Sequence, residues 1–169
     1  IQSLVKLSRM ESGIIAVHSE DTTIAQMFES IQQQFNVKVR EKNITLSLCD
    51  TDLHVRCDSK WTVEALGNIV DNAIKYTACG GNVQIKVEQY YFFVKIDIID
   101  DGIGIEKEEI PKIFGRFYRS LSVADQPGVG IGLFLAREII QAQKGYIKVT
   151  SKRGKGSTFS VFLPIAKKE

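Results

Sequence analysis

Residues 67–77, GNIVDNAIKYT, place two asparagines one helical turn apart and follow them with a lysine and a tyrosine. Asparagine is a mediocre helix former, because its amide competes for nearby backbone groups. At roughly 100° per residue, Asn68, Asn72, Lys75 and Tyr76 share one arc of a helix, opposite its apolar side. Amides and an ammonium group on one arc can bind an ion or a polar ligand, but they can equally form a solvated face. This helix alone leaves both interpretations open.

A second polar motif, DIIDDGIGI at residues 97–105, follows a strand-like run. The strand is predicted to end in Asp100, and Gly102 and Gly104 then let the backbone bend closely around a neighbouring group. Turns that combine an acid with glycines are common, so this motif by itself is weak evidence for a site.

A third motif, PGVGIGLFLARE at residues 127–138, has Gly128, Gly130 and Gly132 directly before a predicted helix. Glycines at this place expose backbone N–H groups at a helix N-terminus, where the helix dipole favours a phosphate. A Rossmann nucleotide site would need a strand immediately before the glycines and an acidic residue about twenty positions later, and neither is present. The sequence also contains no P-loop motif.

A fourth motif, IFGRFYRS at residues 113–120, alternates aromatic residues with Arg116 and Arg119. It lies in a stretch from 101 to 130 that is rich in glycine and charge, with at most short helical pieces. A loop of this length in a compact domain is usually a lid, a binding loop or disorder. The arginines are either cationic ligand contacts or ordinary solvated side chains.

The elements that must position these motifs follow from hydrophobic periodicity and turn residues. The predicted helices are a terminal stub over 1–12, an amphipathic helix from Thr22 to about Val39, a helix capped by Ser59 that runs to Thr77, and a helix over about 131–143. The predicted strands are 43–49 and 54–58, paired as a hairpin, then 83–89 and 92–100, and a closing hairpin of 146–152 and 157–164 that turns at RGKG. The expected fold is one α/β (α+β) domain with a mixed sheet of about five strands and three long helices.

Composition excludes several other classes of protein. The chain has 169 residues, 44% hydrophobic and 25% charged, with a net charge of +2, which favours neither nucleic acid nor an anionic membrane as a partner. Three cysteines and two histidines, without a CxxC pair, argue against a zinc site and for free thiols in a reducing compartment. The most apolar stretch, 90–99, is interrupted by charges and is too short to span a bilayer.

Taken in order, the four motifs resemble the ATP-binding catalytic domain of sensor histidine kinases, in the superfamily that shares the Bergerat fold with gyrase, Hsp90 and MutL. NIVDNAIKYT resembles the N box, DDGIGI the first glycine box, IFGRFYR the F box and GVGIGL the second glycine box. The resemblance covers about residues 20–165 and implies a two-layer sandwich whose mostly antiparallel sheet is covered on one face by the three helices. It also implies that residues 1–14 end the dimerisation and phosphoacceptor helix, that 15–169 form the catalytic domain, and that about 106–130 form a flexible ATP lid.

The resemblance implies ATP and Mg²⁺ as cofactors and assigns roles to matching positions. Asn72 would ligate Mg²⁺, and Asn68, Asn72 and Lys75 would be the catalytic residues. Asp100 would accept a hydrogen bond from the adenine amine, and Arg116 would be a further candidate phosphate contact. The positions assigned to ATP are Asn68, Asn72, Lys75, Tyr76, Asp100, Gly102, Ile103, Gly104, Ile105, Phe117, Arg119, Gly128, Val129, Gly130, Ile131, Gly132, Leu133 and Thr158.

The implied reaction is transfer of the γ-phosphoryl group to a histidine on helices that this sequence lacks, for relay to an aspartate of a response regulator. Neither His18 nor His54 lies in a phosphoacceptor motif. ATP-hydrolysing relatives carry a glutamate at the position of Asn68, and an amide cannot replace that base at neutral pH. The expected partners are the missing helices and a receiver domain, without nucleic acid or direct membrane contact.

Three alternatives remain open: a module that binds ATP without transferring it, a gyrase-type ATPase, and an anti-sigma-type serine kinase of the same fold. For the kinase, the expected state is a monomeric cytoplasmic domain of a homodimeric protein, with membrane anchoring of that protein left open.

Overall fold

The computed structural model describes residues 4, 5, 8, 16–119 and 130–165 of the chain. In chain order, the elements are β1 Glu20–Thr23, α2 Ile24–Glu41, β2 Thr45–Leu48, β3 His54–Cys57, α3 Ser59–Tyr76, β4 Asn82–Gln89, β5 Phe93–Asp100, the short 3-10 helix η1 Ile110–Lys112, α4 Gly132–Ala142, β6 Tyr146–Lys152 and β7 Gly156–Pro164. Leu4, Val5 and Ser8, from the predicted terminal helix, are helical. The predicted domain boundary near residue 14 lies outside the described residues.

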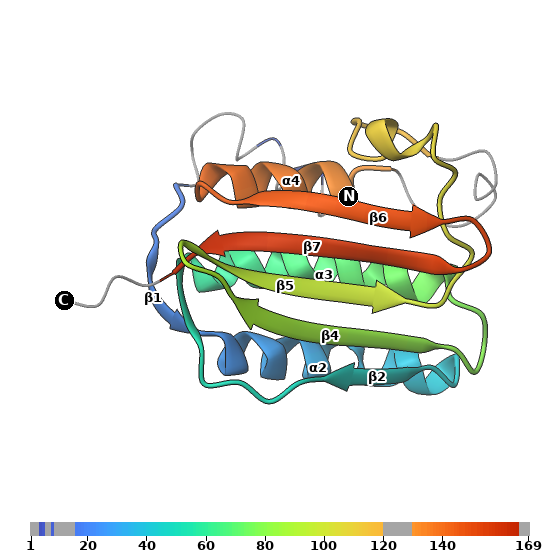
Figure 1. The fold of residues 1–169 in the computed structure, drawn as a ribbon, viewed down its shortest axis with the longest axis horizontal. Helices are drawn as coiled ribbons and strands as arrows, with labels where there is room; N and C mark the ends of the chain where they lie inside the picture. The colour runs from blue at the N-terminus through green and yellow to red at the C-terminus, as the bar shows by residue number, and fades with distance from the viewer. Residues whose placement is uncertain (1–3, 6–7, 9–15, 120–129, 166–169) are drawn as a thin grey trace.

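Two layers form the domain (Figure 1). The main sheet has the order β2-β4-β5-β7-β6, in which only β2 and β4 pair in parallel, and β1 and β3 form a separate antiparallel pair. Helices α2, α3 and α4 lie side by side on one face of the main sheet, and its other face is open (Figure 1). The predicted fold class is therefore confirmed.

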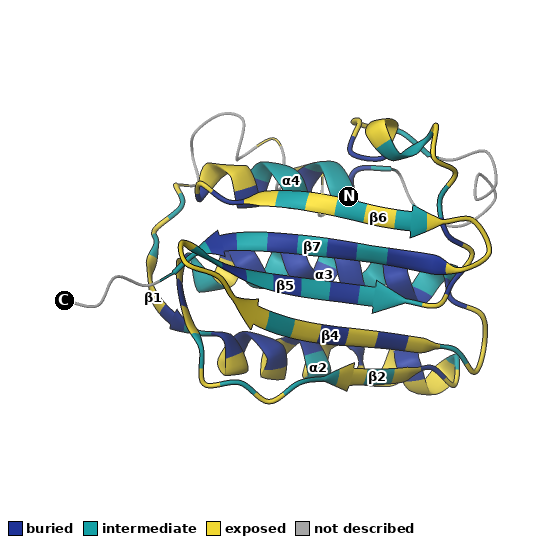
Figure 2. Cartoon of the chain, viewed as in Figure 1, coloured by how far each residue is buried: buried dark blue, intermediate teal, exposed yellow. Residues whose placement is uncertain are grey.

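The core lies between the helices and the sheet, and its residues follow the periodicities expected from the sequence. Alternate residues of β5 and β7 are buried, because the strands present every second side chain to the helices (Figure 2). The apolar side of helix α3 is buried against these strands. The buried residues of these three elements include Leu66, Ile69, Val70, Ala73, Ile74, Val94, Ile96, Ile98, Val161 and Leu163.

The predicted hairpin of 43–49 and 54–58 is wrong. Strand β2 pairs in parallel with β4, with Thr45 opposite Asn82, and β3 pairs with β1, with Val55 opposite Thr22. The sequence EDTT of β1 lacks apolar alternation, so it gave no strand signal. Two adjacent short strands therefore belong to different sheets.

The predicted cap of the helix at 59–77 is also wrong by one residue. Asp58 is the N-cap of α3, and its Oδ1 accepts a hydrogen bond from the backbone N–H of Trp61 at 3.1 Å. Ser59 is the first helical residue. Aspartate and serine are both good caps, so the sequence alone did not separate them.

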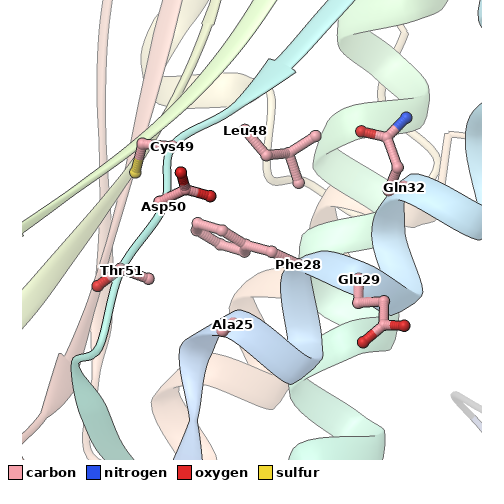
Figure 3. A pocket seen from close by; sticks show the side chains of 8 residues that line it. All are labelled: Ala25, Phe28, Glu29, Gln32, Leu48, Cys49, Asp50 and Thr51. Carbon is pink, nitrogen blue, oxygen red and sulfur yellow. The ribbon is translucent and has the colours of Figure 1, made fainter.

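Several chain segments with polar motifs converge at one end of the sheet. Helix α3 and strand β5 both end on the right in Figure 1, and α4 begins there, beside the segment that follows β5. A cavity of about 280 Å³ lies elsewhere, between α2 and the segment after β2 (Figure 3). Its lining includes Phe28, Leu48 and Cys49 but none of the positions assigned to ATP.

Within the described ranges, no helix combines the length and apolar character needed to cross a membrane.

Candidate functional site

Asp100 stands at the end of β5, where the strand turns into the first glycine motif. Its Oδ1 accepts a hydrogen bond from the backbone N–H of Gly102 at 2.9 Å, which fixes the carboxylate at the strand end. Partial burial raises the pKa of Asp100, while hydrogen bonds from the N–H groups of Gly102 and Ser157 act in the opposite direction and favour the charged form. The result is a positioned, half-buried hydrogen-bond acceptor.

The first glycine motif is held between the end of α3 and the turn from β6 to β7. The backbone N–H of Ile103 donates to the carbonyl of Tyr76 at 3.1 Å, and that of Ile105 donates to Oγ of Ser151 at 2.8 Å. Gly104 has a φ of +72°, and a Cβ there would collide with the carbonyl of Lys152. Only glycine fits both the conformation and the close approach. These contacts bring the first glycine motif against the asparagine-bearing helix.

Asn68 connects α3 to the start of α4. Its Nδ2 donates to the carbonyl of Gly132 at 3.1 Å. Ile131, the N-cap of α4, is buried and provides no side-chain cap, while Leu133 in the first turn is half-buried. The first backbone N–H groups of α4 thus lack a side-chain acceptor at the cap, which is the arrangement that favours an anionic ligand.

Asn72 and Lys75 lie on the last turns of α3 and are both half-buried. Among the described residues, Asn72 has no side-chain hydrogen-bond partner. The ammonium of Lys75 lies 3.0 Å from Oδ2 of Asp71, one helical turn earlier. Asp71 was not among the predicted site residues, although its position four residues before a lysine is a recognisable signal for an ion pair.

The F-box segment lies against the start of α4. The guanidinium of Arg116 lies over the ring of Phe134, 5.0 Å from its centroid. Gly130 has a φ of +74°, and a Cβ there would lie 2.8 Å from the carbonyl oxygen of Tyr118. Phe117 also has a positive φ, +62°, and its side chain is 55% exposed.

The charge of Arg119 acts on Tyr76, at the end of α3. Burial raises the pKa of Tyr76, and the positive charge of Arg119 acts against that increase. The second arginine of the F box is therefore close enough to the end of α3 to affect a tyrosine there. Of the remaining predicted positions, Gly128 and Val129 lie outside the described residues.

Thr158, which was predicted to contact ATP, lies on the opposite face of the sheet from Asp100. On β7, Thr158 is opposite Ile99, whereas its neighbour Ser157 is opposite Asp100. Because side chains alternate along a strand, Thr158 faces the open side of the sheet and Ser157 faces the helices with Asp100. The strand register thus points to Ser157 as the residue beside Asp100. The alternation of apolar residues along β7 was the sequence signal for the face that Ser157 occupies.

Residues 57–167 match the protein family described as histidine kinase-, DNA gyrase B- and HSP90-like ATPases. The chain belongs to this ATPase family. The matched residues include all four motifs described above.

Individual relatives are sensor kinases. The chain is 34% identical to the sensor histidine kinase WalK of Bacillus subtilis over 97% of its own length and 28% of that of WalK. Among solved structures, the mycobacterial sensor histidine kinase MprB superposes with a TM-score of 0.77 at 25% identity, covering 88% of this chain and 98% of that one. The nucleotide-free catalytic domain of the histidine kinase ThkA superposes with a TM-score of 0.76 at 26% identity, covering 88% of this chain and 96% of the ThkA chain. ThkA has also been solved in complex with the response regulator TrrA.

The chain spans less than half the length of the curated sensor kinases that it resembles, such as WalK and the PmrB and SasA proteins. The portion that it shares with them contains the ATPase-family domain. Within this domain, direct contacts join the N-box helix to the first glycine motif and to the second. The sequence predicted that these segments form one site, and the two contacts show that the segments lie side by side.

Proposed function

We propose that this chain is the ATP-binding catalytic domain of a two-component sensor histidine kinase. The observation that carries the proposal is the meeting of three polar groups at one end of the fold: the last turns of α3 with Asn72 and Lys75, the carboxylate of Asp100, and the first turn of α4 without a side-chain cap. An acceptor for an adenine amine, a cation and a set of backbone donors match the parts of one nucleotide.

Asn72 would hold Mg²⁺ through its amide oxygen, and the chemistry of the described residues fits that ion. Mg²⁺ prefers oxygen ligands and usually binds through one or two protein groups, waters and substrate phosphates. Within the described part of the chain, no group of three or more His, Cys, Asp or Glu residues could hold a metal by itself. An ion bound mainly by phosphate and one amide needs no such group. When bound, Mg²⁺ would neutralise charge on the transferring phosphoryl group.

The remaining residues would bind and orient ATP. Asp100 would accept a hydrogen bond from the exocyclic amine of adenine, the N–H groups at the start of α4 would bind phosphate oxygens, and Lys75 would add a positive charge. Arg116 and Arg119 would contribute further positive charge from the lid. Phosphoryl transfer depends mostly on such positioning and charge neutralisation, which this set of residues would supply together with Mg²⁺.

Asn68 supports transfer to a protein nucleophile over hydrolysis. Its amide donates to the carbonyl of Gly132 and cannot take a proton from water at neutral pH. A base that activates water is therefore missing at this position, which disfavours a gyrase-type ATPase. An imidazole nitrogen is a better nucleophile than unactivated water and can attack the γ-phosphorus, with ADP as the leaving group.

The acceptor histidine would come from the dimerisation helices of the whole protein. His54 pairs with Asp21, and the backbone N–H of His18 donates to Asp58, the cap at the start of α3. Asp58 precedes Asn72 by fourteen residues, about 21 Å along a helix. Both histidines thus belong to the other end of α3. The relay would continue to an aspartate of a response regulator in the cytoplasm, where ATP is available.

An assay in two stages tests the proposal. Calorimetry with Mg²⁺-ATP should show binding to this chain that disappears when Mg²⁺ is chelated. γ-Labelled ATP should then label the helical acceptor domain of the whole protein when that domain is added in trans, and the label should be labile to acid, as phosphohistidine is and phosphoserine is not. ATP binding without any label on the acceptor would contradict the kinase function and favour a nucleotide-binding module. A label stable to acid would favour a serine kinase.

A further inference from the structure

Two lysines from different helices share the carboxylate of Asp71 at the proposed nucleotide site. Lys75, on the same helix, lies 3.0 Å from Oδ2, and Lys38, near the end of α2, lies 2.9 Å from Oδ1. Each ammonium has its own carboxylate oxygen. One lysine can therefore leave while the other keeps its hydrogen bond.

The environment of this trio requires Asp71 to keep a counter-ion. Its side chain is only 26% exposed, compared with 32% for Lys75 and 57% for Lys38. Burial alone raises the pKa of Asp71, but the hydrogen bonds and charges of the two lysines outweigh burial and lower the pKa below its ordinary value. Asp71 is thus a partly buried, charged carboxylate, and its burial would be unfavourable without a partner.

Helix α2 also holds the backbone of the same turn. The ammonium of Lys42 donates to the carbonyls of Ile74 and Lys75, both at 2.8 Å. Because these bonds satisfy carbonyls at the C-terminal end of α3, they keep its last turn in place. The side chain of Lys75 can then move without a shift of the helix.

We propose that Lys38 is a positioning residue that keeps Asp71 neutralised when Lys75 turns from Asp71 to a nucleotide phosphate. Without nucleotide, Lys75 is paired with Asp71. With nucleotide bound, the Oδ1 contact to Lys38 remains and the Oδ2 contact is given up. The inference rests on the proposed function and adds a regulatory contact to it.

The physical reason is the sign of the charges involved. A polyphosphate that approaches α3 meets Lys75, which attracts it, and Asp71, which repels it. Because Lys38 neutralises part of the charge of Asp71, it reduces that repulsion and weakens the ion pair between Asp71 and Lys75. Partly exposed ion pairs change equilibria by a factor of at most about five, so the effect should be modest but measurable.

A double-mutant cycle in the full chain tests this role, with the dissociation constant of Mg²⁺-ATP measured by calorimetry. Lys38→Met should weaken ATP binding about two- to fivefold, and Lys38→Arg should restore most of it. Asp71→Asn should bind ATP at least as well as the wild type, because it frees Lys75 and removes a negative charge. In the Asp71→Asn background, Lys38→Met should have almost no further effect.

Arg40→Gln is the matched control. Arg40 is exposed on the last turns of α2 and has the same charge as Lys38, but it does not contact Asp71. Its loss should leave ATP binding within experimental error of the wild type. Thermal unfolding of each variant shows that the folded protein is being compared.

Four outcomes would overturn the proposal. If Lys38→Met weakens binding equally in both backgrounds, or if Arg40→Gln has the same effect, Lys38 acts only as part of the general positive field. If Lys38→Met changes nothing while the wild type binds ATP, the shared carboxylate plays no part in binding, and the proposed function stands. If the wild type itself binds no nucleotide, both the proposed function and this inference fail.

Discussion

The two ends of α3 carry polar residues that differ in how completely they are hydrogen-bonded. At the N-terminal end, Gln143, the C-cap of α4, is buried, and its Oε1 accepts from the backbone N–H of Asp58 at 2.5 Å and from the hydroxyl of Thr62 at 3.3 Å. At the C-terminal end, Asn72 is half-buried and has no side-chain partner among the described residues. Both ends look equally polar in the sequence.

This difference in hydrogen bonding distinguishes polar groups that stabilise the fold from polar groups that are available to bind a ligand. At the first end, Gln143 also donates to the carbonyl of Ile139, so its donors and acceptors are used within the protein. At the second end, the groups keep unused capacity and lie next to a helix N-terminus and a positioned carboxylate. We therefore expect substitutions at the first end to change stability and substitutions at the second to change binding.

Loss of the Asn72 amide should have the largest effect on function. Asn72→Ala removes the proposed Mg²⁺ ligand and should reduce phosphoryl transfer to the acceptor domain at least about a hundredfold. Unfolding should be nearly unchanged, because the side chain is half-exposed and has no described partner to lose. Asn36→Ala, at an exposed position of α2, is the control and should leave transfer unaffected. Wild-type transfer by the Asn72 variant would exclude this residue from the site.

Loss of Gln143 should produce the opposite result. Gln143→Leu leaves the N–H of Asp58 and the hydroxyl of Thr62 without their acceptor in a buried place, which should lower the free energy of unfolding by about 2–3 kcal/mol. The folded fraction of the variant should bind ATP with an affinity within about twofold of that of the wild type. Chemical denaturation measures the first quantity and calorimetry the second. Gln141→Leu, on the exposed face of α4, is the matched control. A large loss of affinity with normal stability would contradict the contrast between the two ends.

Asp100→Asn should weaken ATP binding while leaving the protein as stable as the wild type or slightly more stable. A hydrogen bond to a charged acceptor is worth about 1.5–3 kcal/mol, so the dissociation constant should rise roughly ten- to a hundredfold. Because the pKa of Asp100 is raised in the folded state, its charged form costs stability above that pKa, and the cost disappears as the pH falls. Any gain in stability from the amide should therefore be present at pH 7 and vanish in acid. A variant that binds ATP normally would remove Asp100 from the site.

The smallest expected effect is the pH dependence of the Asp71 ion pairs. The pKa of Asp71 is lowered in the folded state, so its contribution to stability is complete above the ordinary aspartate pKa of 3.8 and is lost as the pH falls through the folded pKa. Because the lysines are partly exposed, this contribution should be about 0.5–1 kcal/mol. Wild type and Asp71→Asn should thus differ in unfolding free energy at pH 7 and converge in strong acid. An equal difference at both pH values would show that the charge is not responsible.

The sequence predicted the long elements of the fold well because each carries its own signal. The apolar arc of α3 and the alternation of β4, β5 and β7 determine which faces are buried, whatever their partners are. The pairing of β1, β2 and β3 was not predictable in this way. Strands of four residues carry little periodicity, and their partners lie far away in the sequence, as Leu48 opposite Ile85 illustrates.

The candidate site was predicted more completely in its motifs than in its contacts. Residue types and order indicated Asn72, Lys75 and Asp100, and the resemblance to a known family supplied their expected roles. The pairing of Asp71 with Lys38 could not be predicted, since the two residues are 33 positions apart and on different helices. The sequence prediction named Thr158 alone, because the register that places Ser157 opposite Asp100 is determined by tertiary packing.

The position of Gly104 has a consequence for recognising inactive members of this family. A side chain at Gly104 would strike the carbonyl of Lys152, so the glycine is needed to close the domain whether or not a nucleotide ever binds. A descendant that had lost catalysis would still have to keep it in order to fold. Divergence at Asn72, whose side chain has no hydrogen-bond partner among the described residues, would be the earlier sign of a pseudoenzyme.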